Sequence, residues 1–419
     1  GIGLTRVSNK NKRKTLLLIS VFSNLGLLGI FKYYDFFVSN FIRAFSIIGG
    51  EFNLTTMNLV LPVGISFYTF QTLSYTIDAY RGKMTPTKDF IAFSAFVSFF
   101  PQLVAGPIER ATHLLPQFYV KRNFDYSLAV DGLRQILWGL FKKMVIADNC
   151  AVFVNLIFAN STDSSGSTLL LGAVLFAFQI YGDFSGYSDI AIGTSRLFGF
   201  DLMQNFAFPY FSRDIAEFWR RWHISLSTWF RDYLYIPLGG SKGGSIKKLR
   251  NTMVIFVVSG FWHGANWTFV IWGILNALYF LPLMFSGNNR NNLDIVAKGR
   301  ILPTFREIIA MMLTFGLTVV AWIFFRADNL PHALSYTKGI FTTSLFSIPQ
   351  FEAQTAIILL LLMISFFLII EWFGREGAHG LERIGFAWKR KTRLAFYFTL
   401  VLAIFFFRRS GESFIYFQF

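Results

Sequence analysis

The chain has 419 residues, of which 54% are hydrophobic and 19% aromatic, while only 15% are charged. Soluble domains carry about 25% charged residues, so this composition indicates an integral membrane protein. Because each spanning helix needs ~20 residues, the length accommodates up to roughly a dozen helices with their loops. We therefore expect no separate soluble domain, and we treat residues 1–419 as one transmembrane domain.

The formal net charge is +16, which raises the question of nucleic-acid binding. The basic residues fall in short clusters between apolar runs, and positive loops retained in the cytoplasm explain this pattern better than a basic binding face does. Cys150 is the only cysteine, so no intrachain disulfide is possible and the fold must depend on helix packing.

The N-terminal region begins with a basic stretch at residues 10–14, followed by an apolar run at 15–31. This order predicts a cytoplasmic stub that enters a first span, with residues 31–34 as an interfacial belt. The sequence starts at Gly1 rather than at a methionine, so we expect a further segment upstream.

Two regions carry unusual apolar runs. Residues 61–75 are interrupted by Ser, Thr, Tyr and Gln, which need partners in lipid, so this helix is expected to face the bundle interior. The apolar run at residues 90–104 ends in a segment that contains Pro101, Gly106 and Pro107, with the glycine between the two prolines. A helix broken there could turn back inside the protein, where irregular backbone is tolerated.

The middle of the chain predicts long helices at 125–158 and 169–200. The second contains Asp183 and Asp189. Carboxylates at membrane depth should face a cavity or pair with a cation, for which Arg196 is a candidate.

Loops and later spans follow from turn residues and charge. Residues 160–167 form a turn-rich linker without Lys or Arg and are the best external loop. Residues 239–250 predict a flexible, basic, cytoplasmic loop, which lacks the Gly-Lys-Ser/Thr ending of a phosphate-binding loop. A basic cluster at 375–393 places another loop inside. Further spans are expected at residues 251–259, 267–285, 308–325, 355–373 and 394–407.

Residues 213–233 combine tryptophans with arginines. Trp219, Trp222, Leu226 and Trp229 follow helical spacing and share one face, which predicts an interfacial helix whose tryptophans mostly anchor it at the headgroups. His223 falls on a different stripe and is expected to point toward the protein interior.

His263 lies between the apolar runs 254–258 and 267–272. Gly260 and Gly264 flank it, and this spacing allows close approach of a helix or a substrate. Ionisable groups within spans are usually functional, so His263 is the stronger candidate. The other histidines, near polar turns, are expected to be structural: His113, His332 and His379.

Two histidines at membrane depth could bind a metal, take part in proton-coupled transport or act in acid–base catalysis. A zinc or haem site needs ligands that Cys150 and the scattered carboxylates do not supply, so we expect no metal. A proton-coupled or polysaccharide transporter, using Asp183 or Asp189, remains an alternative. General base catalysis is the most economical interpretation, because a neutral imidazole can remove a hydroxyl proton near neutral pH.

Four motifs, in this order, closely resemble the membrane-bound O-acyltransferase family. They are Gly-Ile-Ser-Phe-Tyr at 64–68, Phe-Pro-Gln-Leu-Val-Ala-Gly-Pro-Ile at 100–108, Arg-Asp-Ile-Ala-Glu-Phe-Trp-Arg-Arg-Trp-His at 213–223, and Phe-Trp-His-Gly at 261–264. Within the family, they are most similar to the branch of alginate O-acetyltransferase membrane subunits. Residues 414–419 also resemble the C-terminus of that branch.

The resemblance implies an all-α, polytopic membrane bundle around a tunnel, in the cytoplasmic (inner) membrane. The family's catalytic histidine matches His263 and its second motif histidine matches His223. The implied reaction moves an acetyl group from a cytoplasmic thioester such as acetyl-CoA, with no bound cofactor, to hydroxyls of an extracytoplasmic polysaccharide. A partner of the SGNH type often completes the transfer, and the family usually has further spans before the position of Gly1.

Other residues are candidates for binding. Arg220, Arg221 and the basic loop at 242–250 could attract the phosphates of coenzyme A, although positive-inside topology explains them equally well. Candidates for the polar lining of the tunnel are Ser227, Asp232, Tyr233 and Asn266.

Overall fold

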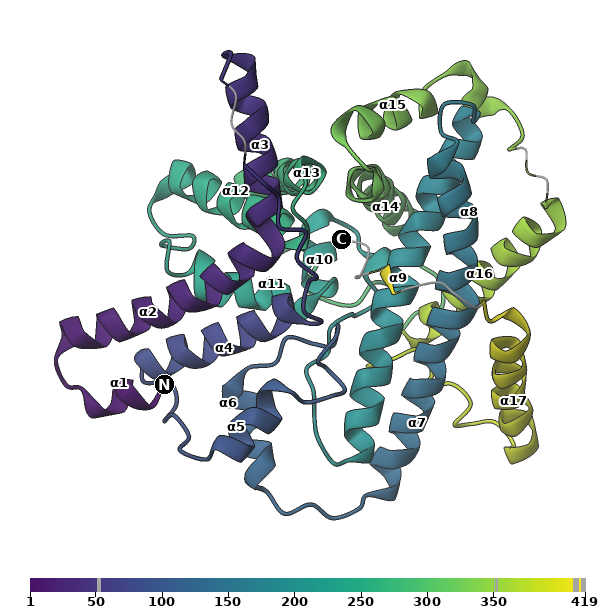
Figure 1. Cartoon of the computed structure of the whole chain (residues 1–419). Coiled ribbons are helices and arrows are strands. Elements are labelled where there is room, and N and C mark those ends of the chain that lie inside the picture. Colours follow the sequence, from purple (N-terminus) through teal and green to yellow (C-terminus); the bar gives the residue numbers. More distant parts are fainter. Residues whose placement is uncertain (51–53, 350, 352, 410–413, 416–419) are drawn as a thin grey trace.

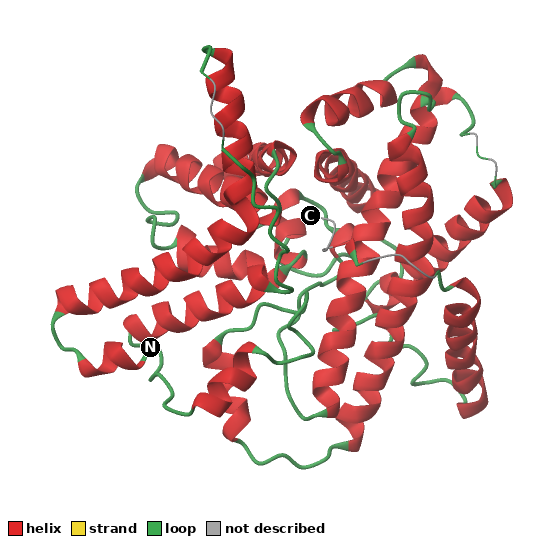
Figure 2. Cartoon of the chain, in the orientation of Figure 1, coloured by secondary structure: helices red, strands yellow, loops and turns green. Residues whose placement is uncertain are grey.

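The computed structural model describes residues 1–50, 54–349, 351, 353–409 and 414–415. The described residues form helices joined by loops and contain no β-strand (Figures 1 and 2). This confirms the all-α fold class. Four residues of the resembling C-terminal motif, 416–419, lie outside the described part.

A long helical column forms the middle of the molecule, where α7 and α8 run beside α9 (Figure 1). Glycines allow this approach: a Cβ at Gly139 would lie 2.6 Å from the carbonyl oxygen of Gly186. The prediction of long helices on either side of the linker at residues 160–167 is confirmed. The elements are α7 (Tyr126–Phe141), the π-turn η3 (Lys142–Ala147), α8 (Asp148–Ala159) and α9 (Gly166–Leu197).

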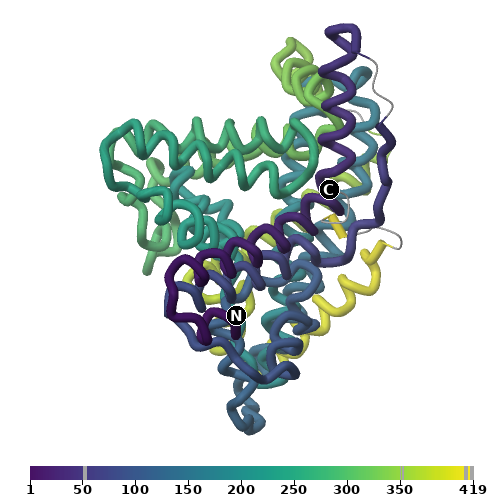
Figure 3. The backbone as a smooth tube through the Cα atoms, turned by 60° about the vertical axis from the view of Figure 1, so that its left-hand side comes forward, coloured from purple at the N-terminus to yellow at the C-terminus, as the bar shows by residue number. Residues whose placement is uncertain are grey.

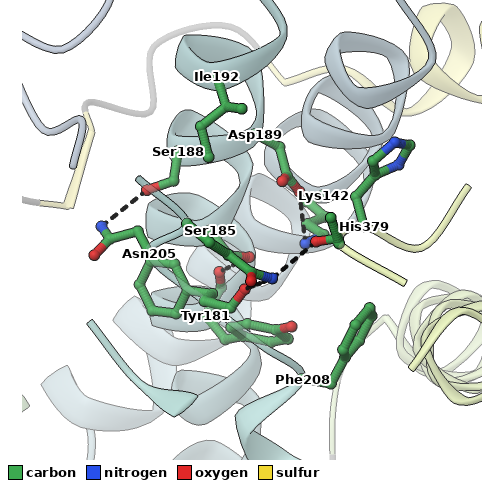
Figure 4. Close-up of a pocket in the computed structure, with 12 residues that line it drawn as sticks. Lys142, Tyr181, Ser185, Ser188, Asp189, Ile192, Asn205, Phe208 and His379 are labelled. Carbon is green, nitrogen blue, oxygen red and sulfur yellow. Dashed lines mark hydrogen bonds and ion pairs between the residues drawn. The ribbon is translucent and has the colours of Figure 1, made fainter. Parts of the chain in front are cut away.

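Charged side chains of this column, together with Glu371, form a largely buried ion-pair centre. We define it as Lys142, Lys143, Asp148, Asp183, Asp189 and Glu371. Lys142 Nζ lies 2.8 Å from Asp189 and 3.3 Å from Glu371, while Lys143 Nζ lies 2.7 Å from Asp183. Figure 4 shows Lys142 pointing toward Asp189 beside a cavity of about 10 Å³. Such a volume fits about one water molecule.

The expectation that Asp183 and Asp189 pair with a cation is confirmed, but the candidate Arg196 is wrong. Arg196 instead pairs with Asp131 on α7. The lysines at the π-turn lie closer to the middle of α9, whereas Arg196 lies at the C-terminal end of that helix.

The N-terminal helices lie to the left of the column in Figure 1. The prediction for residues 61–75 is confirmed, because Ser66, Thr69, Gln71 and Ser74 are all buried. The interfacial belt predicted at 31–34 is wrong in part, since Tyr33 is buried and its hydroxyl donates to the carbonyl oxygen of Phe261. The elements are α1 (Ile2–Arg6), α2 (Lys10–Leu28), the π-turn η1 (Gly29–Tyr33), α3 (Tyr34–Ile47) and α4 (Ile65–Tyr80).

The proline-flanked segment is irregular and largely buried, as predicted. The helix before it ends at Val97, earlier than expected, and Gly106 is packed so closely on Gln102 that a Cβ there would lie 2.3 Å from the Gln102 Cα. The elements are α5 (Phe90–Val97), α6 (Ala111–Leu114) and the 3₁₀ turn η2 (Leu115–Tyr119).

The helices α12 and α13 form an antiparallel hairpin, and Figure 3 shows the two helices along their length. The flexible loop predicted at 239–250 is shorter than expected, because α12 already begins at Gly244. The elements of this region are the 3₁₀ turn η4 (Pro209–Phe211), α10 (Ile215–Arg221), α11 (Ile224–Phe230), the π-turn η5 (Arg231–Tyr235), α12 (Gly244–His263) and α13 (Trp267–Phe285).

In Figure 1 the C-terminal helices surround the column, with α14 and α15 near its upper end and α16 and α17 on its right. Helices occur where spans are predicted at 308–325, 355–373 and 394–407, and the first two are among the candidate membrane spans. The elements of this region are α14 (Phe305–Arg326), α15 (Leu330–Ile340), the 3₁₀ turn η6 (Thr343–Phe346), α16 (Gln354–Gly374) and α17 (Arg390–Phe407).

Within the described residues, five segments are long and apolar enough to cross a membrane: 10–47, α9, α13, α14 and α16. The α9 window is 83% buried inside the protein, whereas the N-terminal one is only 6% buried. The exposed apolar side chains of the outer helices suit contact with lipid. The prediction of a multi-pass membrane bundle is confirmed.

Candidate active site

The tryptophan-rich segment is two helices rather than one. The first, α10, ends at Arg221, and α11 begins at Ile224. Between them His223 has φ +44°, a left-handed conformation that is costly for a residue with a Cβ. The single interfacial helix predicted for this segment is therefore wrong.

The tryptophans of this segment are also not lipid anchors. Trp222 and Trp229 are 3% and 7% exposed and belong to the main core, while Trp219 packs edge-on against Trp272. The break at His223 turns these rings inward. The three-to-four-residue spacing of the tryptophans suggests one exposed helix face, but the rings belong to two short helices that are largely buried.

His223 is fixed by hydrogen bonds. Its side chain is buried, and Nδ1 lies 3.0 Å from Asn205 Oδ1, which also accepts from Ser225 Oγ at 2.9 Å. The Asn205 amide nitrogen donates to Ser188 Oγ. Because the Asn205 oxygen faces the ring, His223 Nδ1 carries the proton and Nε2 carries the lone pair. Nε2 is buried and has no hydrogen-bond partner among the described residues.

His263 is the last residue of α12, and its side chain is buried among aromatic rings. The ring centroids of Trp272 and Phe325 lie 5.1 Å and 5.2 Å away, both edge-on. Gly264 is pressed against Phe269, where a Cβ would lie 2.1 Å from a ring carbon. Only glycine fits there, which supports the predicted role of small residues beside this histidine.

The structure brings the two histidines into one region, which we call the histidine centre and define as His223, His263, Asn205 and Trp262. The Trp262 ring lies 6.2 Å from the His223 ring and 4.9 Å from the His263 ring. No group of three or more metal-ligating side chains occurs in the described part of the chain.

A cavity of about 550 Å³ approaches this centre. Ser259, one helical turn before His263, lies in its wall, and so does Leu226, three residues after His223. Much of the wall is apolar, while Arg231, Lys248 and Arg290 also line it. The cavity therefore combines an apolar interior with cationic groups.

The predicted binding residues are only partly brought together. Ser227 lines the cavity. Arg220 donates to the carbonyl oxygens of Asn289 and Asn292, on either side of Arg290. Arg221 pairs with Glu217 at 2.9 Å.

The remaining predicted residues make local contacts. Asp232 pairs with Arg231 at 2.8 Å, and the Tyr233 hydroxyl donates to Asp78 at 2.5 Å. Asn266 caps α13 by accepting from the backbone N–H of Thr268. Asn266 thus holds the turn that follows His263.

Comparison with known proteins decides the family. The model of the membrane-bound O-acyltransferase family matches residues 83–324, a region that contains both histidines and the cavity. The chain belongs to the membrane-bound O-acyltransferase family. The family and the enzyme class predicted from the four motifs are confirmed.

Several curated relatives of this O-acyltransferase are similar over most of the chain. A probable alginate O-acetylase of Pseudomonas putida is 36% identical over 100% of this chain and 87% of its own length. That of Pseudomonas syringae is 41% identical over 78% of this chain, but the match spans only 61% of the relative. A peptidoglycan O-acetyltransferase of Helicobacter pylori is 38% identical over 78% of this chain and 65% of its own length.

Two residues of this O-acyltransferase centre were missed by sequence reasoning. Asn205 and Ser225 are fully buried and hold His223. A buried polar residue beside a motif histidine is a weak sequence signal, because asparagine and serine are common in loops. Only the fold brings Asn205 back to His223.

Proposed function

We propose that this chain moves an acetyl group from a cytoplasmic thioester toward hydroxyls of an extracytoplasmic polysaccharide. The single observation that carries the proposal is the meeting of two buried histidines around Trp262, near a cavity with cationic lining whose wall includes Leu226 and Ser259. Relatives named for alginate O-acetylation and peptidoglycan O-acetylation support the choice of acetyl group and polymer.

The cavity suits a thioester donor with a phosphate-bearing carrier. Arg231, Lys248 and Arg290 can attract phosphates, and the apolar wall can take the pantetheine arm. Acetyl-CoA is the donor that we propose. Arg220 then acts indirectly, because it holds the loop that presents Arg290.

His263 is proposed as the general base. Its imidazole removes the proton of the acceptor hydroxyl as that oxygen attacks the thioester carbonyl. The tetrahedral intermediate collapses, the carbon–sulfur bond breaks, and the leaving thiolate takes the proton from the imidazolium. The products are the acetyl ester and the free thiol, with no net release of protons.

His223 is proposed to support this step. Asn205 holds the Nδ1–H tautomer, so the Nε2 lone pair is available to accept a hydrogen bond from another hydroxyl of the acceptor and so to orient the reacting hydroxyl toward His263. The aromatic surroundings exclude water, which strengthens each polar interaction made there. Ser227 and Asn266 then contribute to the polar lining and to the turn at His263, respectively.

The wider setting follows from the same proposal. The donor is cytoplasmic and the polymer is outside, so we place the protein in the cytoplasmic (inner) membrane with a tunnel through the bundle. An extracytoplasmic partner of the SGNH type is proposed to complete the transfer to the polymer.

Replacing His263 tests the chemical assignment. We expect His263→Ala to lower acetyl transfer by about 10²- to 10⁴-fold, the usual contribution of an aligned general base. Release of coenzyme A from acetyl-CoA by purified protein in liposomes, together with the ester content of the polymer, measures this. The half-exposed His113 provides the control His113→Gln. Normal polymer acetylation by His263→Ala at equal protein abundance would show that the assignment is wrong.

The cationic lining has a separate test. We expect Arg290→Ala to raise the KM for acetyl-CoA about five-fold, with kcat unchanged, because one partly solvated charge contributes only ~1 kcal/mol. The exposed Lys298 provides the control Lys298→Ala. An unchanged KM over a range of salt concentrations would argue against phosphate binding by this residue.

A further inference from the structure

The helix α12 ends at His263 without the left-handed glycine that commonly follows a helix. Gly264 has φ −163° and ψ 154°, an extended conformation rather than a left-handed one. The last carbonyl groups of a helix have no partner within the helix and need one from outside. In the dry interior of a membrane protein, carbonyls without partners are costly.

Two consecutive side chains of the N-terminal region supply these partners. The Tyr33 hydroxyl donates to the carbonyl oxygen of Phe261 at 3.0 Å and lies 3.4 Å from that of Trp262. Lys32 Nζ donates to the carbonyl oxygen of His263 itself at 2.9 Å. Three successive carbonyls at the end of α12 are thus contacted by two neighbouring residues.

The local backbone explains how neighbours can do this. Lys32 and Tyr33 end the π-turn η1, which inserts a wider turn between α2 and α3. Such turns within helices often occur at functional sites. Figures 1 and 3 both show this N-terminal helix pair crossing next to the α12–α13 hairpin.

Ring contacts strengthen the same junction. Tyr33 stacks on Phe261 with centroids 4.4 Å apart, and Lys32 Nζ lies 5.9 Å from the Trp262 ring. On the other side of the turn, the Trp267 indole donates to Asn40 of α3 at 2.8 Å. The turn that follows His263 is therefore held on one side by η1 and on the other by α3.

We propose that Lys32 and Tyr33 are positioning residues for His263, acting through the backbone carbonyls at the end of α12. This rests on the proposed function, and it goes beyond it because residues 1–82 precede the region that the family model matches. The N-terminal helices are then part of the active site's support as well as a membrane span.

The test compares Lys32→Met and Lys32→Arg in the purified full chain, with acetyl-CoA as the probe. We expect Lys32→Met to lower kcat by about 10²-fold, the scale of loss when a reacting group is displaced by ~1 Å. The KM for acetyl-CoA should stay within about two-fold, since Lys32 does not line the cavity. Lys32→Arg should restore most of kcat, because it keeps a donor to the His263 carbonyl.

The smaller change Tyr33→Phe removes one donor and keeps the ring. It should lower kcat by about five-fold, as expected for one hydrogen bond of ~1 kcal/mol. Lys14→Met is the matched control, because Lys14 is an exposed lysine on α2. If Lys32→Met had the same kcat as Lys14→Met, or if its activity fell only in step with protein abundance, the inference would be overturned.

Hydrogen–deuterium exchange separates this inference from the proposed function. The amides of residues 261–266 should exchange faster in Lys32→Met than in Lys14→Met, whatever the donor is. Wild-type protein that releases no coenzyme A from acetyl-CoA would refute the donor assignment alone. Unchanged exchange at 261–266, with wild-type activity intact, would refute the role of Lys32 alone.

Discussion

The ion-pair centre and the histidine centre are both buried, yet they are built in opposite ways. In the ion-pair centre each lysine faces two carboxylates: Lys142 faces Asp189 and Glu371, and Lys143 faces Asp148 and Asp183. In the histidine centre the described partner of the His223 ring is the neutral side chain of Asn205. His223 has one ring nitrogen without a hydrogen-bond partner among the described residues, and aromatic rings surround His263.

This difference indicates a division of roles. A buried charge whose partners are all in place is satisfied, and its removal leaves uncompensated charges behind. A buried imidazole nitrogen with a lone pair and no partner can instead accept a proton or a hydrogen bond from a substrate. We therefore expect changes in the ion-pair centre to affect stability, and changes in the histidine centre to affect the reaction.

The largest expected effect is in the ion-pair centre. Lys142→Met leaves Asp189 and Glu371 without their cation, and removal of one partner of a buried pair typically costs about 3–5 kcal/mol. The free energy of unfolding in detergent should fall by roughly this amount. The activity per folded molecule should stay close to that of the wild type.

The partly exposed pair of Lys83 and Asp78 provides the control, since Lys83 is 54% exposed. Lys83→Met should change the free energy of unfolding by less than about 1 kcal/mol. A Lys142→Met protein that kept its normal stability but lost its specific activity would show that the ion-pair centre takes part in the reaction. That result would contradict the division of roles.

Asn205 tests the other half of the comparison. Asn205→Ala removes the acceptor that fixes the His223 tautomer, so we expect kcat to fall by about 10- to 100-fold, as when the hydrogen-bond partner of a metal-bound histidine is lost. Asn149, a buried asparagine beside the ion-pair centre, provides the control Asn149→Ala. The division of roles would fail if both variants lost activity only in proportion to their loss of folded protein.

Much of the fold could be predicted from the sequence, because long apolar runs have few alternatives in a membrane. The span predicted at 267–285 has the bounds of α13, where Asn266 caps an uninterrupted apolar helix. The break at His223 could not be predicted. A spacing of three to four residues suits one helix, and the break depends on distant contacts, such as the bond from the Ile224 N–H to the Asn205 carbonyl.

The candidate site shows the same limit. His263 stands out in the sequence because an ionisable residue in an apolar run is unusual. Its supports do not stand out. Lys32 appears as an interfacial lysine, and its bond to the His263 carbonyl joins residues 231 positions apart. Such contacts come from packing, which residue spacing does not encode.

The smallest expected effect comes from His113, which lies outside both centres on the short helix α6. Its Nδ1 lies 2.8 Å from the Glu109 carboxylate, and this hydrogen bond raises the pKa of His113 above its usual value. A histidine with a raised pKa contributes stability that is fully present below its unfolded pKa of about 6.5 and is lost as pH rises through the folded pKa.

His113→Gln should therefore be less stable than the wild type near pH 6, and the two proteins should converge as pH rises above the raised pKa. The His113 side chain is 38% exposed, so solvent screening limits the difference to less than about 1 kcal/mol. Thermal unfolding midpoints in detergent between about pH 6 and 9, on either side of the usual histidine pKa, measure this. A difference in unfolding midpoint that grew with pH would contradict the ion pair with Glu109. A changed kcat in His113→Gln would show that α6 contributes to the active site.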